Sequence, residues 1–432
     1  MKKINVSLVA SFLIATNLYS QQTSSLDEIT ISSATKSEEK LKNVTANVDV
    51  ITAEDIESRK FKTVIEALNS LSGVSISSNG GIGTLSQVYL RGMKSENTLV
   101  LIDGIRYNNP YNGSVDFAHL MINDIERIEV IKGAQSSVWG ADASAGVINI
   151  ITKSSQDGTH GNASFEYGRY DTKIAKANIS HKTDNFDAKL GVTRVDTDGF
   201  SAMTPRGEKA KKYEDDGYEN TTVDLKLGYN FDDNNRVSLG YETIDAKTNF
   251  DDEIYASTYP WAIDPIASAN SKAQTKTRNS LANLNYENKN SFATTNVYTN
   301  YSRFKNESEA PSFTSRNKTD VKEYGVKSTI PYLSETSSVT MGAEYKGFED
   351  KEDINRKYNS RAIYITNTNK FFSDKTILSQ ALRYDKYSDF DNKTTGKIGI
   401  KQYIIDDLNI SSNYGTGYNV PNLYQLHDVW AG

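Results

Sequence analysis

The 432-residue chain has no cysteine and only four histidines. This excludes disulfide frameworks, thiol nucleophiles, iron–sulfur clusters and most transition-metal sites, but leaves carboxylate sites for hard cations. Hydrophobic residues make up only 37% of the chain and its mean hydropathy is -0.57. After the N-terminus the chain lacks a run of the roughly 18 apolar residues that a membrane helix needs, so a helical membrane protein is excluded. The net charge of -6 offers no general attraction to nucleic acid, and we expect none to bind.

Proline is also scarce, with 7 residues, whereas tyrosine is frequent, with 26. This mixture is typical of strands with interfacial aromatic residues. From residue 159 onwards apolar and polar residues alternate, most clearly at Val223, Leu225, Leu227 and Tyr229. The alternation predicts a mainly β fold with about 13 antiparallel strands. Ten residues tilted by about 45° span roughly 23 Å, which matches the apolar band of an outer-membrane barrel.

The connections between the predicted strands alternate between short and long. The long polar connections are predicted at residues 196–220, 245–279, 305–321 and 349–361. Outer-membrane barrels have short periplasmic turns and longer extracellular loops. The alternation therefore favours a transmembrane antiparallel β-barrel over a secreted β-sandwich or β-helix.

The N-terminal part is organised differently. Lys2 and Lys3 precede an apolar stretch at residues 6–18, which is typical of a secretory signal peptide and indicates export. Thr52 followed by Asp55 predicts a capped helix start, and apolar spacing predicts a second helix near residues 63–71. We expect four segments: a signal peptide at 1–20, a flexible tether at 21–40, an α+β domain at 41–153 and a barrel at 154–432.

Two runs in the α+β domain carry a family resemblance. Residues 89–110 (YLRGMKSENTLVLIDGIRYNNP) and 125–152 (IERIEVIKGAQSSVWGADASAGVINIIT) resemble the plug domain of TonB-dependent outer-membrane transporters. The run LDEITI in the tether resembles the TonB box of that family, and an extended segment of this kind can add a strand to a partner's sheet. The TonB box candidates are Leu26, Asp27, Glu28, Ile29, Thr30 and Ile31.

The resemblance implies a plug inside the barrel lumen and a location in the bacterial outer membrane. It also implies active import of cobalamin, or alternatively of a ferric siderophore or haem, driven through TonB and its inner-membrane energising complex. A passive porin or an adhesin is less favoured, because neither needs a TonB box or a plug.

Charged residues in the plug leave two interpretations open. They could form a solvated strand face, or they could make salt-dependent contacts between the plug and the barrel. The candidates are Arg91, Glu126, Arg127, Glu129 and Lys132.

The two longest predicted loops are rich in carboxylates. A solvated acidic surface is one interpretation, and a calcium site, which needs six to eight oxygen ligands, is the other. Parts of these loops resemble the calcium-binding loops of cobalamin receptors, with Glu214 as a departure from that pattern. By this resemblance the calcium candidates are Asp198, Glu214, Asp216, Asp245 and Asp251.

Other chemistry finds little support. The four histidines lie in different elements and no catalytic triad, paired catalytic acids or nucleotide fingerprint emerges, so we expect no enzyme and no redox or nucleotide cofactor. Residues 80–83 (GGIG) lack the Lys and Ser of a phosphate-binding loop and are interpreted as a flexible plug loop. Plugged transporters have about 22 strands, so the 13 predicted here indicate a C-terminally truncated barrel with roughly nine strands missing.

Overall fold

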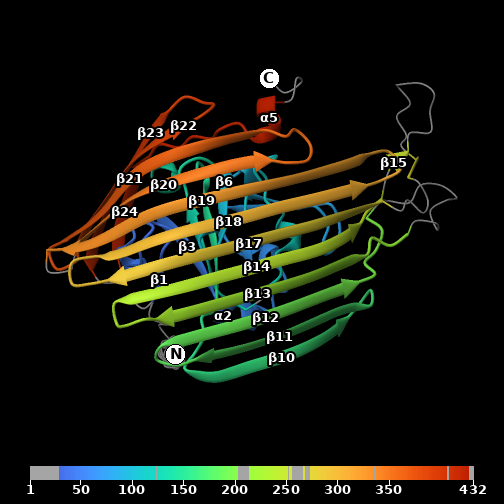
Figure 1. The fold of residues 1–432 in the computed structure, drawn as a ribbon, viewed down its shortest axis with the longest axis horizontal. Helices are drawn as coiled ribbons and strands as arrows, with labels where there is room; N and C mark the ends of the chain where they lie inside the picture. Colours follow the sequence, from blue (N-terminus) through green and yellow to red (C-terminus); the bar gives the residue numbers. More distant parts are fainter. Residues whose placement is uncertain are drawn as a thin grey trace, which may run out of the picture.

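The computed structural model describes residues 29–122, 124–202, 214–251, 253–254, 266–267, 273–333, 337–405 and 408–427. One large antiparallel sheet curves around a small N-terminal domain (Figure 1). In this described part of the chain, no helix has the length and apolar character needed to cross a membrane.

The large sheet has 13 strands in sequence order, each hydrogen-bonded to the next, which confirms the predicted mainly β, antiparallel architecture. Its edge strands, β10 and β24, do not pair with each other among the described residues, so the sheet is not closed. The strands are β10 (Gly158–Gly168), β11 (Thr172–Lys182), β12 (Phe186–Thr197), β13 (Tyr218–Asn230), β14 (Asn235–Asn249), β17 (Gln274–Lys289), β18 (Thr294–Glu309), β19 (Thr314–Tyr332), β20 (Ser337–Asp350), β21 (Lys357–Phe371), β22 (Thr376–Tyr387), β23 (Lys393–Ile405) and β24 (Leu408–Gly415). The short strands β15 (Glu253–Ile254) and β16 (Ile266–Ala267) pair separately.

Side chains of the large sheet alternate between an outer and an inner face, as strand geometry requires. On β21, Ile363 and Ile365 are 63% and 42% exposed, whereas Ala362, Tyr364 and Thr366 are buried against the interior. The outer face is therefore apolar, as expected for a surface in contact with lipid.

The strands extend further than the sequence predicts. β18 and β19 meet at a tight turn, where the Ala310 N–H donates to the Phe313 carbonyl at 2.9 Å, so the long loop predicted at 305–321 was wrong. Both faces become polar beyond the apolar band, so the alternation disappears although the backbone ladder continues. Two long connections remain, at 198–217 and 250–273, and they define the long-loop end of the sheet. The opposite end is the short-turn end.

The small domain contains a five-stranded sheet in the order β3-β8-β9-β6-β7, in which only β6 and β9 run parallel. Thr52 caps α2 as predicted, because its side chain accepts from the Asp55 N–H while the Asp55 carboxylate accepts from the Thr52 N–H. The elements are β3 (Asn47–Thr52), α2 (Ala53–Arg59), α3 (Val64–Asn69), β4 (Val74–Ser78), β5 (Ser86–Leu90), β6 (Thr98–Ile102), β7 (Ile105–Arg106), β8 (Ile125–Lys132), α4 (Ser136–Trp139) and β9 (Gly146–Thr152). After β24 a short helix, α5 (Leu423–His427), follows.

Apolar side chains join the small domain to the inner face of the large sheet near the long-loop end. The Tyr107 ring meets the Phe304 ring edge-on, with 5.8 Å between the ring centroids. The plug is therefore held by a dry contact as well as by charged ones, which sequence reasoning did not anticipate. We refer to the wall residues of this contact as the apolar seal: Ile244, Leu281, Phe304, Val321 and Phe348.

Toward the short-turn end, the small domain and the sheet separate to enclose a cavity of about 810 Å³. Its lining includes the amide side chains of Asn283, Asn296 and Asn300 of the wall and Asn149 of the small domain. The interface thus changes from close apolar packing at one end to an open cavity with polar groups at the other.

The predicted flexible tether at 21–40 is only partly described, and its described part is folded. β1 (Thr30–Ile31) pairs with β2 (Glu39–Lys40), and the Leu41 N–H donates to the Ile29 carbonyl at 2.8 Å. Ile31 is fully buried against Ile131 of β8. Residues 29–40 therefore form a docked hairpin rather than a tether, because Ile29 and Ile31 find an apolar surface on the plug. We call residues 29–40 the N-terminal hairpin.

Candidate functional site

The N-terminal hairpin is fastened to the plug through one buried carboxylate. The Ser33 N–H donates to Glu129 Oε2 at 3.1 Å, and the Ser33 hydroxyl donates to the same oxygen. The Trp139 indole N–H donates to the Ser33 carbonyl at 2.7 Å. Hydrogen bonds to an ionised acceptor are stronger than neutral ones, so Glu129 is a firm anchor for the hairpin.

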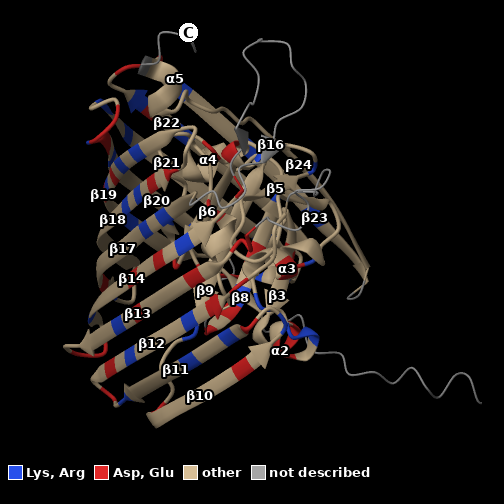
Figure 2. Cartoon of the chain, turned by 90° about the vertical axis from the view of Figure 1, so that its right-hand side faces the viewer, with Lys and Arg blue, Asp and Glu red and all other residues tan. Residues whose placement is uncertain are grey.

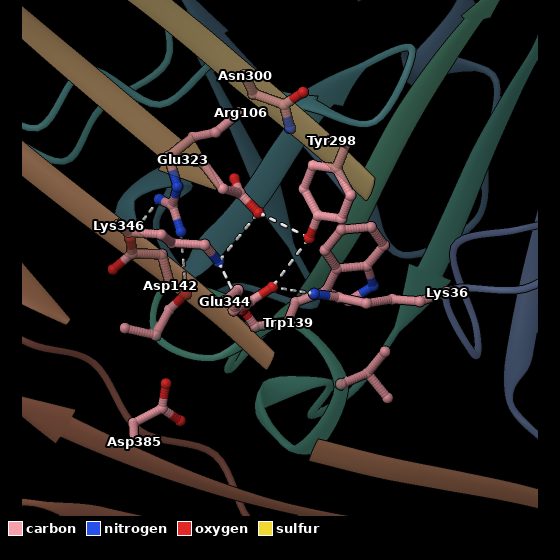
Figure 3. A network of polar contacts seen from close by, with 12 residues as sticks. Lys36, Arg106, Trp139, Asp142, Tyr298, Asn300, Glu323, Glu344, Lys346 and Asp385 are labelled. Atoms are coloured by element: carbon pink, nitrogen blue, oxygen red, sulfur yellow. Dashed lines mark hydrogen bonds and ion pairs between the residues drawn. The ribbon is translucent and has the colours of Figure 1, made fainter. Parts of the chain in front are cut away.

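Lys36 at the hairpin turn fastens the same segment to the sheet wall (Figure 3). The residue has a φ of 61°, a left-handed conformation that turns the chain, and its Nζ lies 2.6 Å from Glu344 Oε2 on β20. The ammonium also lies over the Trp139 and Tyr364 rings, at 4.7 and 4.5 Å from their centroids. Burial lowers the pKa of Lys36 to about 8, and the charge of Glu344 opposes this shift.

Glu344 is the centre of a wider set of buried charges. Its Oε1 lies 3.0 Å from Lys346 Nζ and 2.5 Å from the Arg383 guanidinium, which also makes two 2.7 Å hydrogen bonds to Asp385. Removing one member of such a buried set leaves uncompensated charge in a low-dielectric site. The Glu344 cluster consists of Lys36, Tyr298, Glu323, Glu344, Lys346, Arg383 and Asp385.

The charged residues that sequence reasoning assigned to plug–barrel contacts have other partners. Arg127 pairs with Glu126 and, at 2.9 Å, with Glu129, while Lys132 donates to the Ser72 carbonyl within the plug. Arg91 is exposed, at a φ of 52°. Four of these residues lie on β8 and have their ion-pair partners within the plug, whereas Arg91 lies in a plug turn. In the described part of the chain none of the five forms an ion pair with the sheet, so the geometry does not support their predicted role as barrel contacts.

A different set of ion pairs connects the plug to the wall. Asp124 carboxylate lies 2.7 Å from Lys189 Nζ on β12, and Asp103 lies 3.0 Å from Lys226 Nζ on β13. Each pair joins a carboxylate of a plug turn to a lysine on the inner face of a strand. The predicted kind of contact is therefore present, although the residues differ. Lys62 of the plug and Glu166 of β10 form a further plug–wall pair, in which the lysine belongs to the plug and the carboxylate to the sheet.

The structure brings together only part of the predicted calcium set. Asp216 Oδ2 accepts from the Ala202 N–H at 2.9 Å, and Asp251 Oδ2 accepts from the Ser201 hydroxyl at 2.9 Å, so both carboxylates gather at residues 201–202. Burial, with Asp251 and Glu214 nearby, raises the pKa of Asp216 to about 6. Within the described residues no group of three or more acidic or histidine side chains is placed to hold a metal ion.

Among the other calcium candidates, Asp245 stands apart from this carboxylate pair. Asp245 is exposed on β14 and forms an ion pair with Arg278 of β17, so it does not join Asp216. Asp198 lies just after β12, where its N–H donates to the Tyr170 carbonyl at 3.0 Å.

The plug loop at residues 80–83 is docked on the rim of the sheet. The Thr248 hydroxyl donates to the Gly83 carbonyl at 3.0 Å, and Gly83 packs against the Tyr218 ring. Its φ is 87°, and a Cβ there would lie 2.0 Å from a Tyr218 ring carbon. Glycine is required at this position for both its conformation and its size.

Replacing Gly83 by alanine therefore should detach this loop. We expect Gly83→Ala to lower stability by about 3 kcal/mol, because backbone strain and a steric overlap add together. Gly104→Ala is the matched control, since Gly104 has a similar φ of 79° but open space around its Cβ position, and should cost about 1 kcal/mol. Urea titration followed by proteolysis of the plug measures the loss of stability in each variant. Equal losses in Gly83→Ala and Gly104→Ala would show that the Tyr218 contact is unimportant.

Comparison with known proteins now decides the family. Residues 40–147 match the family described as "TonB-dependent Receptor Plug Domain", and residues 149–430 match "TonB dependent receptor-like, beta-barrel". The chain belongs to the TonB-dependent receptors. This is a family of transporters and receptors rather than of enzymes, and its β-barrel members are outer-membrane proteins.

Curated relatives of this receptor include vitamin B12 transporters. The chain is 28% identical over 439 residues to the "Vitamin B12 transporter BtuB" of Photobacterium profundum, covering 99% of this chain and 68% of that protein. It is 27% identical to the protein of the same name from Vibrio cholerae, covering 93% and 64%. The receptor chain thus spans about two thirds of the length of these relatives.

Solved structures of similar fold include siderophore receptors. PirA of Acinetobacter baumannii superposes with a TM-score of 0.71 at 20% identity, covering 88% of this chain and 62% of that one. A mutant of the ferric enterobactin receptor PfeA of Pseudomonas aeruginosa gives 0.72 at 18% identity, covering 92% and 65%. At these identities the likeness establishes the fold alone.

Sequence reasoning missed the residues that fasten the receptor's hairpin. Glu344 and Lys346 follow the polar half of the predicted alternation, and Lys36 lies in the predicted tether. The sequence contained one indication. Glu344 and Lys346 lie two positions apart and therefore on the same face of a strand, and charges that face the interior need partners there because burying an unpaired charge is costly. The identity of that partner depends on how the hairpin folds, which the sequence pattern does not encode.

Proposed function

We propose that the natural protein imports cobalamin across the bacterial outer membrane in a TonB-dependent manner. The observation that carries the substrate is the similarity to vitamin B12 transporters over nearly all of this chain. In this proposal the long-loop end faces outward, the short-turn end faces the periplasm, and the plug prevents passive flow.

At the long-loop end, the space between the plug and the sheet presents aromatic and amide side chains, which suit a large ligand. Aromatic rings line it, with Phe348 and Tyr358 stacked at 4.6 Å and Phe390 meeting Tyr358 edge-on at 5.2 Å. A cavity of about 330 Å³ beside them is lined by Asn108 and Asn109 of the plug. Rings and amides together provide both apolar contact and hydrogen bonds for the ligand.

The N-terminal hairpin supplies the energy coupling in this proposal. Residues 29–31 are already paired within the hairpin, so TonB reaches a complete box at residues 26–31 only after the hairpin opens. A pull on that segment acts on Ser33 and Lys36, and therefore on both Glu129 of the plug and Glu344 of the wall.

Equilibrium binding of cyanocobalamin tests the substrate. Cells that express the natural gene and lack another cobalamin receptor should bind the ligand tightly, and cells with the empty vector should not. Binding of a ferric siderophore instead, with iron-repressed expression, would contradict the cobalamin proposal and favour the siderophore alternative, which the fold of PirA and PfeA supports equally well.

Calcium is the second component of the proposal. The carboxylates of Asp216 and Asp251 would contribute to a site completed by other loop oxygens, and the bound ion would order the loops for the ligand. We expect chelation of calcium to weaken cyanocobalamin binding about tenfold, and Asp216→Asn to remove most of that dependence. Asp245→Asn is the control, because Asp245 pairs with Arg278 away from this site. Equal calcium dependence in the parent protein and Asp216→Asn would contradict the assignment.

A further inference from the structure

Asparagine side chains gather around the cavity toward the short-turn end of the plug–wall interface. They are Asn283 and Asn285 of β17, Asn296 and Asn300 of β18, and Asn149 of β9 in the plug. Asn283 lies on the same face of its strand as buried Leu281, and Asn300 on the same face as buried Phe304, so both amides point into the lumen. The cavity therefore has carboxamide groups on its wall side and on its plug side.

The two wall strands that carry these asparagines add no charge to the cavity. Among the described residues, β17 and β18 contribute only Leu281, Tyr298 and the four asparagines to its lining. The neighbouring strands β12 to β14 carry charged residues, which Figure 2 shows in blue and red. Of those that line the cavity, Lys226 is paired with Asp103 at 3.0 Å, and Arg236 with Asp187 at 2.5 Å. An uncharged polar stripe on β17 and β18 thus lies beside these ion pairs.

The asparagines have hydrogen-bonding capacity to offer a ligand. Asn283 Nδ2 donates to Asn300 Oδ1 at 2.6 Å, and the two residues are directly opposed. This bond occupies one of the two donors of Asn283 and one of the two lone pairs of Asn300. On the plug side, Asn149 is 2% exposed, and its Oδ1 has no hydrogen-bond partner among the described residues. A buried acceptor without a partner costs free energy, which a donor on a bound ligand would recover.

The cavity lies directly on the short-turn side of the apolar seal. Leu281 belongs to the seal and also lines the cavity. Asn283 follows it toward the short-turn end, about 7 Å further along the strand. Lys182, the last residue of β11, and Arg236, near the start of β14, also line the cavity, so it reaches the short-turn end of the sheet. The seal therefore separates this cavity from the proposed ligand site at the long-loop end.

We propose that this cavity is a second, internal site for the imported ligand and binds it through its carboxamide groups. Cobalamin carries several carboxamide side chains on its corrin ring, and each can exchange a donor and an acceptor with an asparagine. Asn283 and Asn300 contact these groups from the wall, and Asn149 contacts them from the plug. A ligand with ionised carboxylates in their place would bury charge against uncharged amides, which costs free energy. The proposal rests on cobalamin as the imported ligand and adds a site to the one at the long-loop end.

Binding stoichiometry tests the proposal. The purified natural protein in detergent, which leaves both ends accessible, is dialysed to equilibrium against radiolabelled cyanocobalamin. We expect two bound molecules, a tight one at the long-loop end and a weaker one in the cavity. The double variant Asn283→Leu/Asn300→Leu should keep the tight molecule and bind the weaker one about tenfold less tightly, because leucine keeps the branched shape of asparagine but forms no hydrogen bonds. Asn149→Leu should weaken the same second molecule from the plug side.

Another asparagine pair of the sheet provides the matched control. Asn178 Nδ2 donates to Asn162 Oδ1 at 3.0 Å, and these residues are also directly opposed, on β11 and β10. Both are described, and neither belongs to the lining of the cavity. The double variant Asn162→Leu/Asn178→Leu should therefore bind both molecules as the parent does.

The outcomes distinguish this proposal from that of cobalamin import. A single bound molecule in the parent, unchanged in Asn283→Leu/Asn300→Leu, would overturn the internal site and leave cobalamin import standing. Two molecules bound equally well by the parent and by this variant would place the second one elsewhere and also overturn the site. Equal losses in both double variants would show a general effect of asparagine removal and would contradict the cavity assignment. Absence of any binding by the parent would overturn cobalamin import and the internal site together.

Discussion

Glu344→Gln should release the N-terminal hairpin from the lumen wall without unfolding the sheet. Among the described residues, Glu344 is the one carboxylate that forms an ion pair with Lys36, and Lys36 is buried. Arg383 keeps its two hydrogen bonds to Asp385, so the wall side of the cluster retains a partner. Breaking a buried pair from one side costs about 3 kcal/mol or more, which corresponds to roughly a 100-fold rise in the open hairpin population.

A single introduced cysteine measures this opening, because the chain has none of its own. Ala34 is buried in the hairpin, so Ala34→Cys reports exposure with little change in volume. Maleimide labelling of this cysteine should accelerate about 100-fold when Glu344→Gln is added, provided labelling follows local opening. Glu349→Gln on the same strand is the control, since Glu349 is paired with exposed Lys351. If labelling stays slow in Glu344→Gln, the Lys36 contact does not hold the hairpin.

Deleting residues 26–31 should abolish uptake and leave ligand binding unchanged. Uptake requires an extended segment that adds to the sheet of TonB through its backbone, and the deletion removes that segment. The proposed ligand site lies at the opposite end of the protein, among residues such as Tyr358 and Asn108, which the deletion does not touch. Radiolabelled cyanocobalamin separates the two activities, as surface-bound ligand at 4 °C and accumulated ligand at 37 °C.

The deletion also removes buried Ile31, so a control must separate coupling from hairpin stability. Ile31→Ala keeps the backbone but removes an apolar side chain that packs on Ile131, at a cost of about 3 kcal/mol to hairpin docking. We expect this variant to accumulate cobalamin. Loss of uptake in Ile31→Ala as well as in the deletion would mean that hairpin docking, and not strand pairing with TonB, is needed.

The sheet was largely predictable from sequence because its strands pass through an apolar environment. Outward residues such as Ile363 and inward residues such as Thr366 must differ in polarity, so the period of two is visible. The turn at Ala310–Phe313 was missed because the adjoining strand ends, residues 306–309 of β18 and 314–318 of β19, are polar on both faces. Strand length beyond the band depends on backbone pairing alone, which leaves no hydrophobic pattern.

The candidate site was less predictable, because its contacts join residues far apart in the chain. Lys36 and Glu344 are separated by 308 positions, and either residue alone resembles a solvated charge. The resemblance to a family predicted a coupling segment at residues 26–31, but did not indicate that residues 29–31 are held in a hairpin with Ile31 buried. For the acidic loops, the resemblance offered five carboxylates; it could not indicate that Asp216 and Asp251 lie together or that Asp245 faces Arg278, because the direction of Asp245 depends on strand register.

The position of the apolar seal determines the order in which plug–wall contacts would break when the N-terminal hairpin is pulled. In the proposed mechanism, force enters through the hairpin at the short-turn end, where individual polar bonds beside the cavity can break one after another. Phe304, Val321 and Phe348 of the seal lie nearer the other end and would be loaded only after those bonds have failed. Until those bonds break, the apolar seal would block ion flow between the plug and the wall. Hairpin release and ionic leakage are therefore separable events, and a bilayer containing the natural protein should stay electrically silent after the first.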